Sequence, residues 1–178
     1  MSRSNISGNV RLGYSEVSDQ QPGALGEEFT IIPGEYDAAD DVYVNTNAST
    51  VIVKLLKNTS GGTLLPGNIL KRDATGDMSY AVVKATADAP ACAVVDPTLQ
   101  SAVPINGKFL GIIYGETDVL VGAVDLVKGV TISSNATGGA VVNDLSTVAK
   151  VAGACGFIME AGTAATLAKA FVDFRALK

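Results

Sequence analysis

The sequence contains no histidine and no tryptophan, and only two of its 178 residues are cysteine. Histidine is the commonest general base and the commonest metal ligand, so its absence removes the usual centre of both kinds of chemistry. Cys92 and Cys155 stand in the apolar phrases ACAVV and ACGFI, without the basic neighbours that activate a nucleophilic thiol. We expect two buried, reduced thiols, with a disulfide between them as the alternative.

Other signatures of catalysis and of ligand binding are also missing. No serine stands in a nucleophile elbow or an S-x-x-K motif, and the glycine pairs at 61–62 and 138–139 are not followed by the residues of a phosphate-binding loop. The acidic stretch GEYDAADD, residues 34–41, lacks the alternating ligand spacing of a calcium loop. We therefore expect no enzyme activity, no cofactor and no metal site.

The charge is low and acidic: 17% of residues are charged, the net charge is −5 and the pI is about 4.6. This composition argues against nucleic acid and against an anionic membrane surface as partners, and the pair Lys71-Arg72 is too small to reverse that conclusion. The least charged long window, 151–172, still carries Glu160 and Lys169, which disfavours a membrane span. The first 16 residues show no apolar run after their arginines, so we expect no secretory signal.

What the chain does contain is many small and β-branched residues with 19 glycines, a mixture that favours short strands and tight turns. Residues 1–48 differ from the rest, because they are polar and show no sustained period of 2 or 3.6. They are predicted to form an extended N-terminal arm that either stays unstructured or lies across a partner. Residues 49–178 are predicted to form the folded body.

Strands and turns alternate from Val42 onwards. The stretch DVYVNTNASTVIVKLLKN predicts two strands on either side of Asn-Thr-Asn-Ala-Ser, and FLGIIYG and TDVLVGAV predict two more. The C-terminal stretch could form a strand or a helix, because Leu167, Phe171, Phe174 and Leu177 also fit one face of a helix. We favour a strand there, since the internal repeat described next requires one.

The chain repeats one phrase. LLPGNILKRDATG at 64–76 and LVKGVTISSNATG at 126–138 share a leucine, a turn glycine and a closing Ala-Thr-Gly, each 62 residues apart. Both are followed by a strand, AVVK or AVV, and then by an Ala-Cys pair that is 63 residues apart. We interpret this as a duplicated strand-turn-strand unit, with repeat halves at about 64–110 and 126–174.

Residues 55–175 resemble a family of tailed-bacteriophage virion proteins that decorate or cement the capsid. Four phrases carry the resemblance: KNTSGGTLLPGNILK, ACAVVDPTLQSAVPINGKFLGIIYG, VKGVTISSNATGGAVV and GACGFIMEAGTAATLAKAFVDF. The resemblance implies a mainly β fold with a compact β-barrel or β-tulip-like body. It also implies a homotrimer that binds the major capsid protein on the outside of the expanded shell, after assembly in the host cytoplasm.

For such a role, the arm supplies the residues that would contact the capsid or a neighbouring subunit. The candidates are Arg11, Leu12 and Tyr14, with Phe29, Ile31 and Ile32 behind them. The alternative function is that of a binding module of a tail or fibre, which recognises a host-surface ligand such as a glycan. Exposed aromatic residues would be the sign of such a module, and five tyrosines and five phenylalanines are available.

Overall fold

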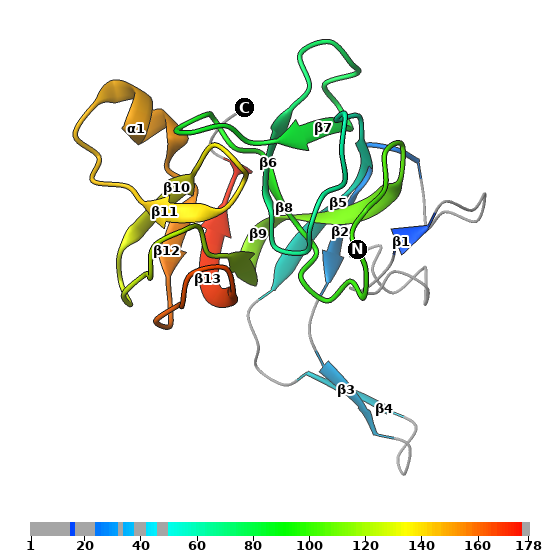
Figure 1. Ribbon diagram of the computed structural model, residues 1–178. Coiled ribbons are helices and arrows are strands. Elements are labelled where there is room, and N and C mark those ends of the chain that lie inside the picture. The colour runs from blue at the N-terminus through cyan, green and yellow to red at the C-terminus, as the bar shows by residue number, and fades with distance from the viewer. Residues whose placement is uncertain (1–14, 17–23, 32–33, 38–41, 46–49, 176–178) are drawn as a thin grey trace.

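The computed structural model describes residues 15–16, 24–31, 34–37, 42–45 and 50–175. Across these residues it shows an eleven-stranded sheet, a separate two-stranded sheet and one short helix (Figure 1). The predicted mainly β class is confirmed. In chain order the elements are β1 (Ser15–Glu16), β2 (Glu28–Ile31), β3 (Gly34–Asp37), β4 (Val42–Asn45), β5 (Val51–Asn58), β6 (Ile69–Arg72), β7 (Ala81–Lys84), β8 (Ala93–Val95), β9 (Lys108–Leu120), β10 (Thr131–Ser134), β11 (Ala140–Val142), α1 (Val148–Gly153), β12 (Gly156–Ile158) and β13 (Leu167–Asp173).

Five strands of the large sheet close into a ring, here called the first ring. β5 pairs with β7 and with β9, β7 pairs with β6, β6 with β8, and β8 with β9. The pairings are antiparallel except between β5 and β7, which run parallel where Asn58 meets Val82. Because each strand has a partner on both sides, the ring holds its shape without an open edge.

A second ring uses the C-terminal half of β9. This half pairs with β13, β13 with β12, β12 with β10, and β10 with β11. A parallel bridge between Val121 and Ala140 closes the circuit, and the N–H of Gly122 donates to the Ala140 carbonyl at 2.8 Å. Figure 1 shows the result as two lobes with β9 running between them.

The two rings repeat the same hydrogen-bond pattern. Leu70 pairs with Ala93 in the first ring, as Ile132 pairs with Gly156 in the second. The N–H of Cys92 donates to the Leu70 carbonyl at 2.8 Å, and the N–H of Cys155 donates to the Ile132 carbonyl at 2.9 Å. The bridge from Leu64 to Val103 likewise has its counterpart from Leu126 to Gly162. The pseudo-repeat inferred from the sequence is therefore present in the strand pairing.

The repeated unit is larger than the halves expected from the sequence. The pair Lys57–Lys108 in the first ring corresponds to Leu120–Leu167 in the second. β5 is thus equivalent to the C-terminal half of β9, and the N-terminal half of β9 is equivalent to β13. The two strands expected on either side of Tyr114 are one continuous strand, which ends the first unit and begins the second. The C-terminal segment is the strand β13, as favoured above.

β9 changes its inward face where the rings meet. Ile112 pairs with Val53 but Tyr114 pairs with Ile52, so Ile113 is an extra residue that makes a β-bulge. A bulge shifts the alternation of side chains by one residue. The side of the strand that faces the interior of the first ring therefore becomes the outer side of the second ring.

Two hydrophobic clusters follow from this change of face. The first-ring cluster fills the interior of the first ring and consists of Leu56, Leu64, Leu70, Val82, Ala93, Val95, Leu99, Val103, Phe109 and Ile113. The main cluster joins the outer face of the first ring, through Leu55, Val94 and Ile112, to the interior of the second ring, through Ile132 and Ile158. The first ring is therefore buried on both faces, whereas the second ring is buried mainly on its inner face.

The segment predicted as an arm contributes to this body. β2 pairs with β5, with Phe29 opposite Val53, and the N–H of Gly26 donates to the Leu55 carbonyl at 2.8 Å. β1 pairs with β9 at Phe109. β3 and β4 pair with each other as a separate hairpin. Within 1–48, residues other than 15–16, 24–31, 34–37 and 42–45 lie outside the described part of the chain.

Candidate functional site

Of the six predicted interface residues, two belong to the described part of the chain. Phe29 and Ile31 lie on the same face of β2 and pack against the main cluster, where Phe29 is only 5% exposed. In this chain the Phe29 side chain therefore contributes to the core of the body. Arg11, Leu12, Tyr14 and Ile32 lie outside the described residues. The interface role of the set stays a prediction.

The two cysteines are not bonded to each other. They are equivalent residues of the two rings; Cys92 packs against the first-ring cluster, and Cys155 is buried in the main cluster. Burial raises the pKa of the Cys92 thiol to about 12, although Arg72 and Lys54 nearby lower it. Burial also raises the pKa of the Cys155 thiol to about 12. Both thiols are therefore protonated at neutral pH, which is unfavourable for nucleophilic chemistry.

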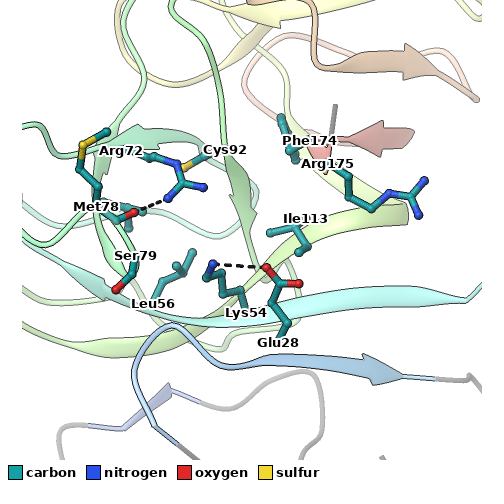
Figure 2. Close-up of a pocket in the computed structure, with 11 residues that line it drawn as sticks. Glu28, Lys54, Leu56, Arg72, Met78, Ser79, Cys92, Ile113, Phe174 and Arg175 are labelled. Carbon is teal, nitrogen blue, oxygen red and sulfur yellow. Dashed lines mark hydrogen bonds and ion pairs between the residues drawn. The ribbon is translucent and has the colours of Figure 1, made fainter. Parts of the chain in front are cut away.

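A pocket of about 110 Å³ opens at one end of the first ring (Figure 2). Its floor is apolar and consists of Leu56, Val82, Cys92 and Ile113. Its rim is charged, with Lys54 from β5, Arg72 from β6 and Glu28 from β2, while Met78 and Ser79 come from the connection between β6 and β7. Phe174 and Arg175 complete the lining, so the pocket is an apolar well whose charged lining residues are Glu28, Lys54, Arg72 and Arg175.

The charged side chains of the pocket differ in their hydrogen-bond and ion-pair partners. Lys54 Nζ lies 3.3 Å from Glu28 Oε1, and the Lys54 side chain is 15% exposed. Arg72 Nη1 donates to the Met78 carbonyl, which is its single partner among the described residues. Figure 2 shows the Arg72 and Lys54 side chains extending into the same space, with the Arg175 guanidinium turned away from them. Arg175 instead pairs with Asp173, its Nη2 lying 3.0 Å from Oδ2.

The corresponding end of the second ring is closed. By strand pairing, Lys54 corresponds to Thr117 and Arg72 to Ser134. Thr117 is 7% exposed and Ser134 is fully buried, with its hydroxyl donating to the Thr86 carbonyl at 2.6 Å. The same position of the same fold therefore holds a cation at an open mouth in one ring and a small buried hydroxyl in the other.

A row of aromatic side chains lies on the outer face of the second ring. Phe157 and Phe171 are stacked with their ring centroids 5.6 Å apart, and Tyr114 meets Phe171 edge-on at 5.2 Å. The Arg175 guanidinium lies 3.5 Å from the centroid of the Tyr114 ring. The side chains of the row therefore pack against one another. Phe157 is the most exposed of the three rings, with 45% of its surface in contact with solvent.

A second exposed surface surrounds α1. The connection from β11 to β12 contains five residues more than its counterpart from β7 to β8, and α1 lies within it. Four exposed aliphatic side chains, here called the α1 surface, belong to this region: Val142 (54% exposed), Leu145 (46%), Val148 (88%) and Val151 (56%).

The loop that leads to α1 is held firmly in spite of an unfavourable backbone conformation. Leu145 has a φ of 55°, a region that non-glycine residues rarely adopt. The buried Asn143 fixes the loop, since its Oδ1 accepts from the Leu145 N–H at 2.9 Å and its Nδ2 donates to the Lys150 carbonyl at 2.6 Å. Lys150 Nζ contacts both carboxylate oxygens of Asp144 at 2.9 Å. These contacts hold Leu145 in a defined position next to α1.

No protein-family model and no curated protein sequence matches the chain. Among solved structures, its fold is similar to that of the head fiber gp8.5 N base of bacteriophage phi29, with a TM-score of 0.51 and 15% sequence identity. The similarity covers 70% of this chain and 95% of that chain. At this level of identity the likeness shows a shared fold.

Sequence reasoning did not single out the pocket. Arg72 stood out only as half of an isolated basic pair, and Lys54 as one residue of a strand. The signal was present in the repeat, because an alignment of the two copies places Arg72 at the position equivalent to Ser134. That comparison requires the register of β6 with β10, which the shared Ala-Thr-Gly turn provides. Lys54 could not be compared, since its counterpart lies in the shared strand β9.

Proposed function

We propose that this protein is a structural component of a phage head, attached to the outside of the capsid through the major capsid protein. The observation that supports this function most is the shared fold with the phi29 head fiber N base, which extends over 95% of that chain. The phrases that resemble capsid decoration proteins are an independent support from the sequence. Together they favour a head-associated protein over other uses of a small β fold.

The physical properties of the body suit attachment. Its strands are held by ring closure, its two cysteines are protonated, and it carries the exposed aliphatic side chains of the α1 surface beside a hydrogen-bonded loop. A protein that binds the expanded shell and not the compact precursor stabilises the expanded state by linkage. Many copies on one shell multiply a modest free energy per site. In this proposal a homotrimer presents three such bodies together.

The test is co-sedimentation of the purified protein with expanded shells and with unexpanded precursor shells. We expect binding to expanded shells that saturates at a fixed number of copies per shell. The absence of binding to both kinds of shell would contradict the proposal. Mass measurement of the unbound protein reports whether the homotrimer exists before attachment.

Two variants separate the arm from the body as the contact with the shell. A truncation that removes residues 1–23 tests the arm, including the short strand β1 that pairs with β9, and leaves β2 in place. A cut at residue 30 would also remove Phe29 from the core. Val148→Asp tests the α1 surface, and Val124→Asp is its control because Val124 is an exposed valine, 70%, on another loop. Loss of shell binding by the truncation alone assigns the contact to the arm. Loss with Val148→Asp but not with Val124→Asp assigns it to the α1 surface.

A binding module for a host glycan is the second candidate, and the aromatic row is the observation that favours it. Sugars stack on open aromatic faces, but here Phe171 and Tyr114 use their faces within the row. Phe157 offers the exposed face. Screening on a glycan array, with Phe157→Ala as the variant, discriminates this function from capsid attachment.

A further inference from the structure

Two of the cations that line the pocket of the first ring have no cationic counterpart in the second ring. The second ring has the same strand pairing and places Thr117 and Ser134 where the first ring has Lys54 and Arg72. Small hydroxyl side chains are therefore sufficient to build this end of a ring. Placing an ammonium and a guanidinium beside an apolar floor carries a desolvation cost. Only the first ring carries this desolvation cost, which indicates that its two cations have a role in binding.

The chemistry of the pocket defines what it accepts. Arg72 presents a planar guanidinium with five donors, and the Met78 carbonyl is its partner among the described residues. Such a fork matches a carboxylate, which accepts two parallel hydrogen bonds. Lys54 adds a second positive charge at the same mouth. Below these groups, Leu56, Val82 and Ile113 give an apolar floor that accepts a short hydrocarbon stem and excludes a bulky ligand from the well.

We propose that this pocket binds a carboxylate carried on a short apolar stem, with Arg72 as its main anchor and Lys54 as the second cation. Two sources supply this chemistry: a free short-chain carboxylic acid, and the side chain of a glutamate in another polypeptide. The site needs only the isolated chain, so it stands or falls independently of capsid attachment.

Neutralising Glu28 should change carboxylate binding in the opposite direction to removing a cation. Its carboxylate lies 3.3 Å from Lys54 Nζ and competes with an incoming anion for that cation. Replacing it with the neutral amide in Glu28→Gln removes this competition and the repulsion between the two carboxylates. Carboxylate binding should then become tighter. A pocket that merely collects apolar molecules would not respond in this way.

The experiment is a titration of the full-length, isotope-labelled chain followed by amide NMR shifts. The probes are butyrate with its neutral counterpart butyramide, and N-acetylglutamate amide with its counterpart N-acetylglutamine amide. We expect saturable shifts at Cys92 and Ile113 with a carboxylate probe and none with its neutral counterpart. The tighter of butyrate and the glutamate derivative identifies the source. No saturable shift with either carboxylate overturns the proposal, and so does equal binding of the neutral counterparts.

Variants locate the site. Arg72→Met keeps the length of the side chain and removes its charge, and should weaken binding about tenfold or more through the loss of charge-assisted hydrogen bonds. The matched control is Lys71→Met, since Lys71 is the neighbouring cation on β6 and its Nζ lies 3.3 Å from Thr86 Oγ1, away from the pocket. Equal weakening by both variants would overturn the proposal.

Because Arg72→Met also removes the contact with Met78, Lys54→Met serves as a second charge-removing variant. It should weaken binding as well, whereas Glu28→Gln should tighten it a few-fold. Weaker or unchanged binding in Glu28→Gln, with unchanged amide shifts elsewhere in the spectrum, would overturn the proposed placement of the anion beside Lys54.

Discussion

The two rings of this protein share a hydrogen-bond pattern and differ in what they bury and expose. The first ring has apolar side chains on both faces and an open mouth with Lys54 and Arg72. The second ring has a closed end at Thr117 and Ser134 and leaves its outer face, with the aromatic row, in contact with solvent. Backbone pairing thus survived duplication while the side chains took separate roles. Differences between equivalent residues are the best guide to function in this chain.

Exchanging the residues at equivalent positions of the two rings should affect stability most at Gly156. Its counterpart in the first ring is Ala93, yet Gly156 has a φ of 153° and a Cβ there would overlap the carbonyl oxygen of Phe171. Gly156→Ala should therefore destabilise the protein by about 3 to 4 kcal/mol, measured by urea denaturation. The reciprocal control, Ala93→Gly, should cost about 1 kcal/mol. Equal effects of the two variants would show that the rings tolerate the same residues.

Leu64 and Leu126 are equivalent core leucines, and both are almost fully buried. Leu64→Ala and Leu126→Ala should each lower the free energy of unfolding by about 3 kcal/mol. Because β9 belongs to both rings, each variant should shift a single common transition. The control is Leu65→Ala, 45% exposed, which should change stability by less than about 0.5 kcal/mol. Two separate transitions in either core variant would mean that the rings unfold independently.

The cysteines test the difference in openness. With a pKa of about 12, roughly one thiol in ten thousand is ionised at about pH 8, so alkylation by iodoacetamide should be slow for both. Cys92 lines the pocket, whereas Cys155 is only 1% exposed. Mass spectrometry should therefore find Cys92 modified first. Modification of Cys155 first, or of both at one rate, would argue against an open first ring and a closed second ring.

The smallest expected effect concerns the equivalent turns at Asp73 and Asn135. Hydrogen bonds from Thr59, at 2.6 Å, and from Thr75 lower the pKa of Asp73 below its ordinary value of 3.8. A lowered folded-state pKa means that the stabilising contribution is present above about pH 4 and is lost as the pH falls through the folded-state pKa. Asn135 makes the same turn contact with Thr137, and its side chain does not titrate.

The measurement is the amide shift of Thr75 and of Thr137 between about pH 5 and about pH 2. The amide shift of Thr75 should report the titration of Asp73 with a midpoint below 3.8. The amide shift of Thr137 should show no such titration. Asp73→Asn should abolish the pH dependence of the Thr75 amide shift while the turn persists, because Asn135 already supports such a turn. A midpoint for Asp73 at or above its ordinary value would contradict the hydrogen-bonded geometry.

Local pattern was enough to predict several elements. AVVK, AVV and VIVKLLKN form strands as their β-branched residues indicated, and the Ala-Thr-Gly phrases mark equivalent turns. The C-terminal strand was correctly favoured over a helix because the repeat required it. The stretch around Tyr114 was divided wrongly into two strands. Its glycine, Gly115, resembles a turn signal, but it lies in a continuous strand at a φ of 112° next to the bulge.

The pocket could not be predicted in the same way. Lys54 and Arg72 are distant in the sequence and lie on strands that are not paired with each other in the ring. Their approach depends on ring closure through β7, β8 and β9. The aromatic row likewise needs β9, β12 and β13 side by side, since Tyr114 and Phe157 have no local relationship.

By itself the sequence determined where strands and turns occur, that the unit is duplicated, and that histidine chemistry is absent. These properties depend on residue types and on spacings of a few residues, which the chain expresses locally. Only the tertiary structure decided which face of each strand is buried, because a strand alternates its side chains in the same way whichever side the sheet curls toward. The bulge at Ile113 and the long-range pairing of β9 set opposite curls for the two rings, and so left a charged pocket in one and an exposed aromatic row on the other.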